Sequence, residues 1–370
     1  MKTPITRIFK KKHIVELNDL IKPTKNRRLT PQLKRANPIR ADVELEELAT
    51  AIRLAKSPDY PNRLKLYAIY ERIIHDSHLQ SQIRTAKLSV LKSDFVIKKN
   101  NKINDKAKDL LAQSWFDKFI DLALDAEFWG HSLIEFSTLN QNNKFTDVTL
   151  IPRTHVKPEK GIVVAEPTDD KGIAYRNYAT QFALIEIGDK YDLGLLETAA
   201  REVIVKNYAR TDWSQASEKY GMPLLKIKTN TSDSKEIDRL EEMAQNFAYN
   251  GYIIINSEDD AEIIQIKSTD FYKIYLENIQ SCNENISKLI NGQTGTSDEK
   301  AYVGSAEVHE RILNNYTFSR LRKMQYIVNN QLIPFLIKWG YPLDGYQFQY
   351  TDLLPKDQPV INENLSELFS

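Results

Sequence analysis

The sequence predicts an α+β protein in which long helices carry a small strand-containing insert. Three segments, residues 194–222, 268–291 and 306–340, repeat apolar residues every three or four positions over more than twenty residues, which is typical of long helices. Between the first two lies a strand–helix–strand–strand pattern at residues 223–267. Residues 42–193 mix helical spacing with short alternating runs, so we expect a mixed α/β region there.

The composition is that of a folded protein without a membrane span. The chain has 370 residues, of which 41% are hydrophobic and 27% charged. No segment approaches the roughly 18 uninterrupted apolar residues of a spanning helix, and the N-terminus lacks the apolar centre of a signal peptide. Cys282 is the only cysteine, which excludes an intramolecular disulfide and zinc sites that need several thiolates.

Charge is distributed unevenly along the chain. Residues 1–40 carry twelve lysines and arginines against two acids, a balance of +10, so the total of +1 leaves −9 for the remainder. We expect residues 1–41 to form an extended basic arm that docks on acidic protein or nucleic acid, or that serves only as a solubilising tail. The expected contact residues of this arm are Lys10, Lys11, Lys12, Arg27, Arg28, Lys34 and Arg35.

The region 42–193 alternates between helical and strand-like patterns. Helices are expected at residues 43–56, 62–77, 78–92 and 105–128. Strands are expected at residues 95–97, 132–136, 148–151, 161–164, 178–183 and 184–187.

The insert has the pattern β-α-β-β and lies between two long helices. Its strands are expected at residues 223–228, 252–256 and 262–267, with a helix at 233–248. The helix before it is closed by Gly221 and Pro223, and the helix after it begins with Ser268 or Thr269 as N-cap. Each long helix is on the order of 40 Å long at about 1.5 Å per residue.

A glycine-rich loop at residues 292–305 separates the second long helix from the third, which is expected to kink at Pro334. A Walker loop would require glycine directly before its lysine, after a strand, and neither condition holds at Lys300. One chain offers too little surface to cover three such helices, so we expect other subunits to bury them.

The remaining chemical signals favour structural roles. His75, Asp76 and His78 could supply metal ligands, but the same run suits a helix break with a capping acid, and no third ligand is evident. Arg320, Arg322 and Lys323 form a basic group that either pairs with acids of an adjacent subunit or faces solvent. The four tryptophans are expected in cores. We expect no catalytic residue, no metal and no cofactor.

Four phrases spread along the chain resemble the portal proteins of tailed phages, specifically the Mu-like branch. They are ERIIHDSHLQSQIRTAKLSVLKSDFVI at residues 71–97, ALDAEFWGHSLIEF at 123–136, WSQASEKYGMPL at 213–224 and ISKLINGQTGTSDEKAYVGSAEVHERI at 286–312. Together with the order of elements, the resemblance covers most of residues 42–350.

The resemblance implies a portal fold in a homo-oligomeric ring, normally a dodecamer. Residues 42–193 and 306–340 would form the wing, 194–222 and 268–291 the stem, 223–267 the clip, and 341–370 a C-terminal segment too short for a large crown. The implied partners are double-stranded DNA, passing without sequence specificity, the large terminase, the major capsid protein and neck or adaptor proteins. The implied location is the portal vertex of the virion, after assembly in the host cytoplasm.

In this family the loop at residues 292–305 would face the channel, and its small residues would suit moving DNA. The resemblance assigns this role to Gly292, Gln293, Thr294, Gly295, Thr296, Lys300 and Gly304. Copies of Lys300 would attract phosphates, while Asp298 and Glu299 would keep the grip loose. One alternative is a head–tail adaptor ring, against which the length of the chain argues. Another is a DNA-processing enzyme of the packaging apparatus, against which the missing Walker loop argues.

Overall fold

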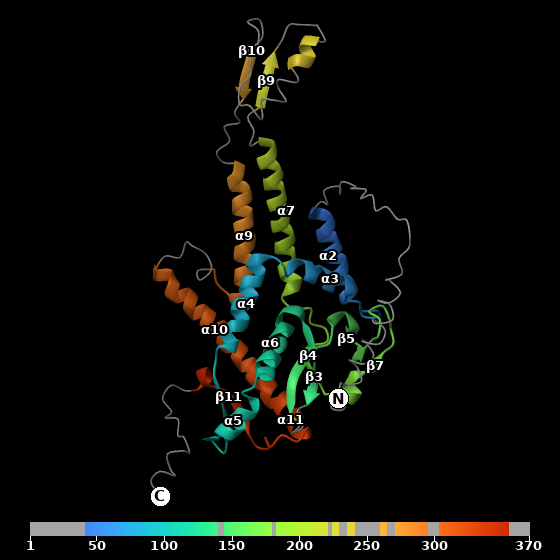
Figure 1. The fold of residues 1–370 in the computed structure, drawn as a ribbon, viewed down its shortest axis with the longest axis vertical. Helices are drawn as coiled ribbons and strands as arrows, with labels where there is room; N and C mark the ends of the chain where they lie inside the picture. The colour runs from blue at the N-terminus through green and yellow to red at the C-terminus, as the bar shows by residue number, and fades with distance from the viewer. Residues whose placement is uncertain are drawn as a thin grey trace, which may run out of the picture. The chain divides into compact units, whose positions relative to one another are not determined.

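The computed structural model describes residues 41–139, 144–179, 183–220, 224–228, 235–240, 260–264, 271–294 and 303–354 (Figure 1). The chain divides into two compact units, unit 1 (Met1–Ile204 with Asn283–Ser370) and unit 2 (Val205–Cys282). The expected basic arm lies outside the described residues. Within them, no helix is both long and apolar enough to cross a membrane.

The first three helices in the described part of unit 1 form where the apolar spacing predicts them. They are α2 (Ala41–Ala55), α3 (Leu64–Ile73) and α4 (Ser77–Leu91). The Asp76 side chain accepts a hydrogen bond from the backbone N–H of Leu79 at 2.9 Å, so Asp76 is the N-cap of α4. The capping interpretation of Asp76 is therefore confirmed.

The single helix expected at residues 105–128 is wrong. The structure has two helices there, α5 (Asp105–Leu111) and α6 (Ser114–Trp129). Ala112 leaves the helical region with φ −71° and ψ 59°, which interrupts the hydrogen-bond ladder. The α6 helix ends at Gly130, whose φ of +83° is the left-handed conformation of a helix-terminating glycine.

Three small antiparallel sheets complete unit 1, in the orders β11-β1-β2, β4-β3-β8 and β5-β6-β7. Their strands are β1 (Phe95–Lys99), β2 (Lys102–Ile103), β3 (His131–Leu139), β4 (Phe145–Leu150), β5 (Val156–Lys157), β6 (Ile162–Val163), β7 (Ile173–Ala174), β8 (Leu184–Gly188) and β11 (Gln347–Tyr350). The strand expected at residues 178–183 is wrong at its start, because Tyr178 belongs to a 3-10 helix, η2 (Tyr175–Tyr178), and Ala179 to a turn; residues 180–182 are outside the described part. The strands β2, β5, β7 and β11 were not expected.

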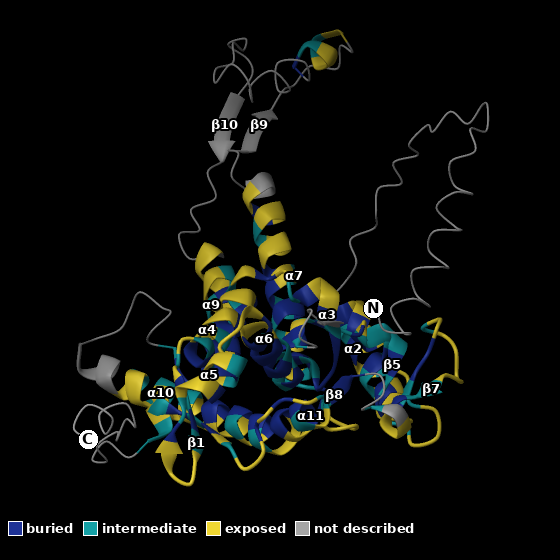
Figure 2. Cartoon of the chain, turned by 60° about the horizontal axis from the view of Figure 1, so that its bottom comes forward, coloured by how far each residue is buried: buried dark blue, intermediate teal, exposed yellow. Residues whose placement is uncertain are grey.

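The core of unit 1 forms where α6, α10 and α11 cover the sheets, in the dark blue region of Figure 2. Aromatic rings dominate it: the Phe136 ring centroid lies 5.1 Å from that of Phe145 and 4.8 Å from that of Phe335. Trp115 is buried in this core as expected. Large rings bury much apolar area each, so these side chains contribute strongly to the core of unit 1.

The third long helix is interrupted. Helix α10 (Val303–Ile327) passes into a π-helix, η3 (Val328–Leu332), and then into α11 (Ile333–Lys338). Pro334 stands in the first turn of α11 and has no N–H to donate, so the wider turn of η3 precedes it in place of a simple kink. Helix α10 begins three residues before the expected start, which places Gly304 in the helix and not in the loop.

Unit 2 contains a strand pair and the adjoining parts of two long helices. Strand β9 (Leu224–Lys228) pairs antiparallel with β10 (Asp260–Ile264), and residues 235–240 are helical. The helices α7 (Leu196–Tyr220) and α9 (Phe271–Asn291) extend from unit 1 into unit 2. The last strand begins at residue 260 rather than 262, and the strand expected at 252–256 lies outside the described residues.

Candidate functional site

The start of the expected channel loop is fixed by the geometry of Gly292. This residue has φ +73° directly after α9, and its N–H donates to the carbonyl of Lys288 at 3.0 Å. A Cβ added to Gly292 would lie 2.3 Å from the ring of Tyr316 on α10. Both the backbone conformation and the close ring therefore require glycine here.

A buried polar network holds the last turn of α9. Asn291 is fully buried, and its Nδ2 donates to the Gln82 side chain on α4 at 2.7 Å and to the Gln82 carbonyl at 3.2 Å. The Asn291 Oδ1 accepts from Arg320 on α10 at 3.4 Å, and Arg320 Nη2 also donates to the carbonyl of Ile290 at 2.6 Å. The carbonyls that end a helix have no partner within it, so Arg320 acts as a side-chain cap of α9.

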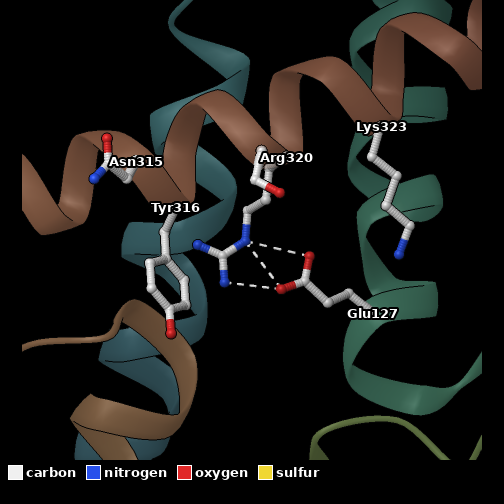
Figure 3. A pocket seen from close by; sticks show the side chains of 6 residues that line it. Glu127, Asn315, Tyr316, Arg320 and Lys323 are labelled. Carbon is white, nitrogen blue, oxygen red and sulfur yellow. Dashed lines mark hydrogen bonds and ion pairs between the residues drawn. The ribbon is translucent and has the colours of Figure 1, made fainter.

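Arg320 is neutralised within its own chain. Its Nε and Nη2 reach Oε1 of Glu127 on α6 at 3.0 and 2.8 Å, and its Nε reaches Oε2 at 3.2 Å (Figure 3). Arg320 was expected to contact another subunit or solvent, and both expectations are wrong, because its side chain is 5% exposed and already paired. Arg322 and Lys323 are exposed in the single chain, so pairing with an adjacent subunit and exposure to solvent both stay open for these two residues.

A second contact ties α4 to α9. His78 Nε2 lies 2.9 Å from the Asn283 carbonyl and 2.8 Å from Ser287 Oγ. Ser287 is fully buried, so this contact satisfies a hydroxyl that would otherwise be costly to bury. His78 thus has a structural partner. In the part of the chain that the structure describes, no group of three or more histidines, cysteines or acids is placed to hold a metal ion.

An open groove of about 440 Å³ lies beside the network, as Figure 3 shows. It is lined by Glu127, Asn315, Tyr316, Ser319, Arg320 and Lys323. The charge of Arg320 is taken up by Glu127, and the Lys323 ammonium makes no ion pair among the described residues. The lining contains no nucleophile beside a general base, so the geometry suits packing and positioning better than chemistry.

Another polar cluster, which sequence analysis missed, joins β3 to β8. Glu186 accepts hydrogen bonds from His131 at 3.0 Å, from Tyr175 at 2.7 Å and from Arg176 at 2.7 and 2.9 Å. Burial raises the pKa of Glu186, but the hydrogen bonds from Arg176, His131 and Tyr175 outweigh it and lower that pKa below its ordinary value. Burial, together with the charges of Arg63 and Arg176, lowers the pKa of His131 although the neighbouring Glu186 acts to raise it. No sequence signal brings these four residues together, because the pairing of β3 with β8 places His131 near Glu186, and η2 supplies Tyr175 and Arg176.

Of the expected loop residues, Gly292, Gln293 and Thr294 follow α9 and Gly304 lies in α10, and Gln293 is buried. Gly295, Thr296 and Lys300 lie outside the described residues, as do the seven basic residues of the arm. The structure thus defines how the loop leaves α9. The residues that sequence analysis missed at this site are Gln82, Glu127 and Tyr316.

Comparison with known proteins agrees with this architecture. Similar solved structures include a chain of the virion of a native gene transfer agent (GTA) particle, with a TM-score of 0.54 and 11% identity over 87% of this chain and 93% of that chain. A chain in the neck of the native GTA particle computed with C12 symmetry has a TM-score of 0.53 and 11% identity over 88% and 93%. An HK97 family phage portal protein from Corynebacterium diphtheriae has a TM-score of 0.45 and 10% identity over 77% and 97%. Among curated proteins, none matches significantly.

These similarities define an α+β class in which long helices join a helix-and-sheet body to a small strand pair. The sequence itself gives the family. The family model for the portal protein of Mu bacteriophage matches residues 67–369. The chain belongs to that portal family, and the resemblance noted in its sequence is confirmed.

Proposed function

We propose that twelve copies of this chain form the ring-shaped DNA channel at the portal vertex of a virion. The observation that carries the proposal is the portal family match over residues 67–369, which includes both long helices and the strand pair between them. The similar neck structure computed with C12 symmetry supports a count of twelve. Both that neck structure and the similar virion structure are of assembled particles, which supports a place in the assembled particle for this chain.

In this proposal α7 and α9 are the stem, and the segment between them is the clip that meets the large terminase and later the neck or adaptor proteins. The two stem helices are linked at their unit 1 ends by a hydrogen bond from Asn285 Nδ2 to Glu202 Oε2 at 3.2 Å. The rest of unit 1 is the wing, which meets the major capsid protein. Residues 292–302 then form the channel loop, anchored at one end by Asn291 and Arg320.

The role is geometric and electrostatic, without catalysis or a cofactor. Duplex DNA passes without sequence reading and without tight binding. Tight binding would hinder passage, because each phosphate contact adds affinity that translocation must break. The chain outside residues 1–40 carries a net charge of −9, which supports a largely repulsive lumen. Force comes from a separate ATPase docked at the clip.

The test is electron cryo-microscopy of the purified full chain, with averages viewed along the ring axis. We expect closed rings with a central opening wide enough for duplex DNA. A compact dimer around a closed cleft would favour a DNA-processing enzyme. Rings that fail to support DNA packaging when supplied to a portal-deficient phage would favour a head–tail adaptor.

A further inference from the structure

Two exposed helix faces of unit 1 are unusual because each combines large apolar side chains with charges of one prevailing sign. The first, here the α10 face, consists of Arg311, Phe318, Arg322, Lys323 and Tyr326. The side chains of Phe318 and Tyr326 are 41% and 57% exposed, although the opposite side of α10 is buried through Leu321 and Met324. Positions 311, 318, 322 and 326 are spaced by seven, four and four residues, so they share one side of the helix.

The basic groups of the α10 face are not neutralised within the chain. Arg311, Arg322 and Lys323 make no ion pair or hydrogen bond with the residues that the structure describes, in contrast to Arg320 on the same helix. Glu310 is the nearest acid along the helix and offsets one of the three charges. The α10 face is therefore apolar with a net positive charge. If nothing covers it, Phe318 and Tyr326 stay in contact with water.

The second, here the α2 face, consists of Val43, Glu46, Glu47, Leu54, Asp59 and Tyr60. Its apolar members are 55%, 37% and 79% exposed for Val43, Leu54 and Tyr60, while Leu48 and Ala51 on the other side of α2 are buried. Glu47 pairs with the exposed Arg72 at 3.2 Å, but Glu46 and Asp59 have no partner among the described residues. With Glu44 included, the carboxylates at this face still outnumber the nearby cations, Arg53 and Arg72, so the face is acidic.

The helices that carry the two faces lie on opposite sides of α4 and α6 in unit 1. In both views α10 is on the left and α2 on the right, with α4 and α6 between them (Figures 1 and 2). A head-to-tail ring needs this arrangement, because each subunit must present two different, complementary surfaces on opposite sides. A two-fold dimer would instead need one self-complementary patch, and neither face is complementary to itself in charge.

We propose that the α10 face of one subunit docks on the α2 face of the next copy of this chain, and that this contact closes the ring. The inference rests on the proposed ring function and names the surfaces that form it. Phe318 and Tyr326 supply apolar area to Val43, Leu54 and Tyr60, while Arg311, Arg322 and Lys323 face Glu46 and Asp59. Opposite charges fix the order of contact, since the two like pairings, α10 on α10 and α2 on α2, repel.

Charge reversal in the full-length chain tests the contact, with assembly measured by light scattering and native mass spectrometry. One variant, Arg311→Glu with Arg322→Glu, reverses the α10 face, and another, Glu46→Lys with Asp59→Lys, reverses the α2 face. We expect each to raise the concentration for half-assembly by roughly tenfold or more. The matched control, Lys106→Glu with Lys171→Glu, reverses two exposed lysines elsewhere and should assemble like the wild type.

Recombination of the two reversed faces gives the decisive result. A chain with all four substitutions, and a one-to-one mixture of the two variants, should both recover rings, and the mixture should alternate its subunits. If the wild-type chain forms rings but the charge-reversed variants assemble equally well, or their combination does not restore assembly, this contact is overturned while the proposed ring stands. A wild-type chain that never assembles would overturn both.

A second measurement does not depend on tolerance of charge reversal. Tyr326→Cys and Leu54→Cys together should be joined between subunits by a short bis-maleimide, giving ladders up to the full ring, because Cys282 is buried and reacts little. Neither single cysteine variant should give a ladder. Absence of ladders from assembled rings of the double variant would overturn the contact.

Discussion

Arg320 on α10 holds Glu127 on α6 through three hydrogen bonds and at the same time caps the carbonyl of Ile290 on α9. One side chain thus links three helices at the point where the expected channel loop begins. Arg320 stands directly before Leu321, which belongs to the buried core of unit 1, so the loop is anchored next to that core. Substitutions at this anchor should therefore change the stability of the chain, and substitutions in the loop beyond it should change the retention of packaged DNA.

Replacement of Arg320 by methionine should destabilise unit 1 by about 1–3 kcal/mol, because the Ile290 carbonyl and the partly buried Glu127 carboxylate would lose their donors. Thermal or urea unfolding of the full chain at one fixed concentration measures this loss. The control is Lys118→Ala, which breaks the exposed pair with Asp147 at 2.7 Å and should cost about 0.2–1 kcal/mol. Equal losses in the two variants would contradict a special role for Arg320.

Gly292→Ala should destabilise the chain more than Gly340→Ala. Both glycines are left-handed, with φ +73° and +84°, so each substitution incurs a backbone cost of about 1–2 kcal/mol. Only at Gly292 does the added methyl also meet the ring of Tyr316, at 2.3 Å, whereas nothing lies within 4 Å at Gly340. Unfolding measurements on both variants isolate the steric part, which Tyr316→Ala should relieve in the double variant. A loss at Gly292 no larger than at Gly340 would show that the ring moves aside freely.

Elements with long local periodicity were predictable from the sequence, and contacts between distant segments were not. Helix α9 was expected at residues 268–291 and occupies Phe271–Asn291, because its apolar spacing is sustained over five turns. Strand β11 has four residues and becomes a strand only by pairing with β1, where Tyr350 faces Phe95 across the sheet. Arg320 was misjudged for the same reason, since Glu127 is 193 residues away in the sequence.

The stability of the chain should fall as the pH decreases below 6.5. Burial lowers the pKa of His131 in the folded state below its ordinary value of 6.5, so from pH 6.5 down to that lower pKa the unfolded chain binds a proton that the folded chain does not. Glu186, whose folded pKa lies below 4.5, adds a loss of the same sign at more acidic pH. The slope from one such group is at most about 1.4 kcal/mol per pH unit.

Urea unfolding at intervals between pH 7.5 and 5, roughly the range in which histidines titrate, measures this dependence. His131→Gln keeps a donor for Glu186 but does not titrate, so its stability should change less over the range than that of the wild type. His155→Gln, which alters a histidine outside the Glu186 cluster, is the control. An unchanged slope in His131→Gln would assign the acid sensitivity to other groups.

Lys300→Ala should weaken the retention of packaged DNA without preventing packaging. In a ring of twelve copies, the proposed loops place twelve ammonium groups around the duplex, and removal of each ammonium from the phosphates reduces both the affinity and its dependence on salt. Phage particles assembled with the variant should release DNA at lower salt or temperature than wild-type particles. Lys171→Ala, an exposed lysine outside the loop, serves as the control. A deletion within residues 293–299 should weaken DNA retention more strongly than Lys300→Ala, because a shortened loop draws Lys300 back toward the Asn291 anchor. If neither variant alters DNA packaging or retention, residues 292–302 serve only to connect α9 to α10.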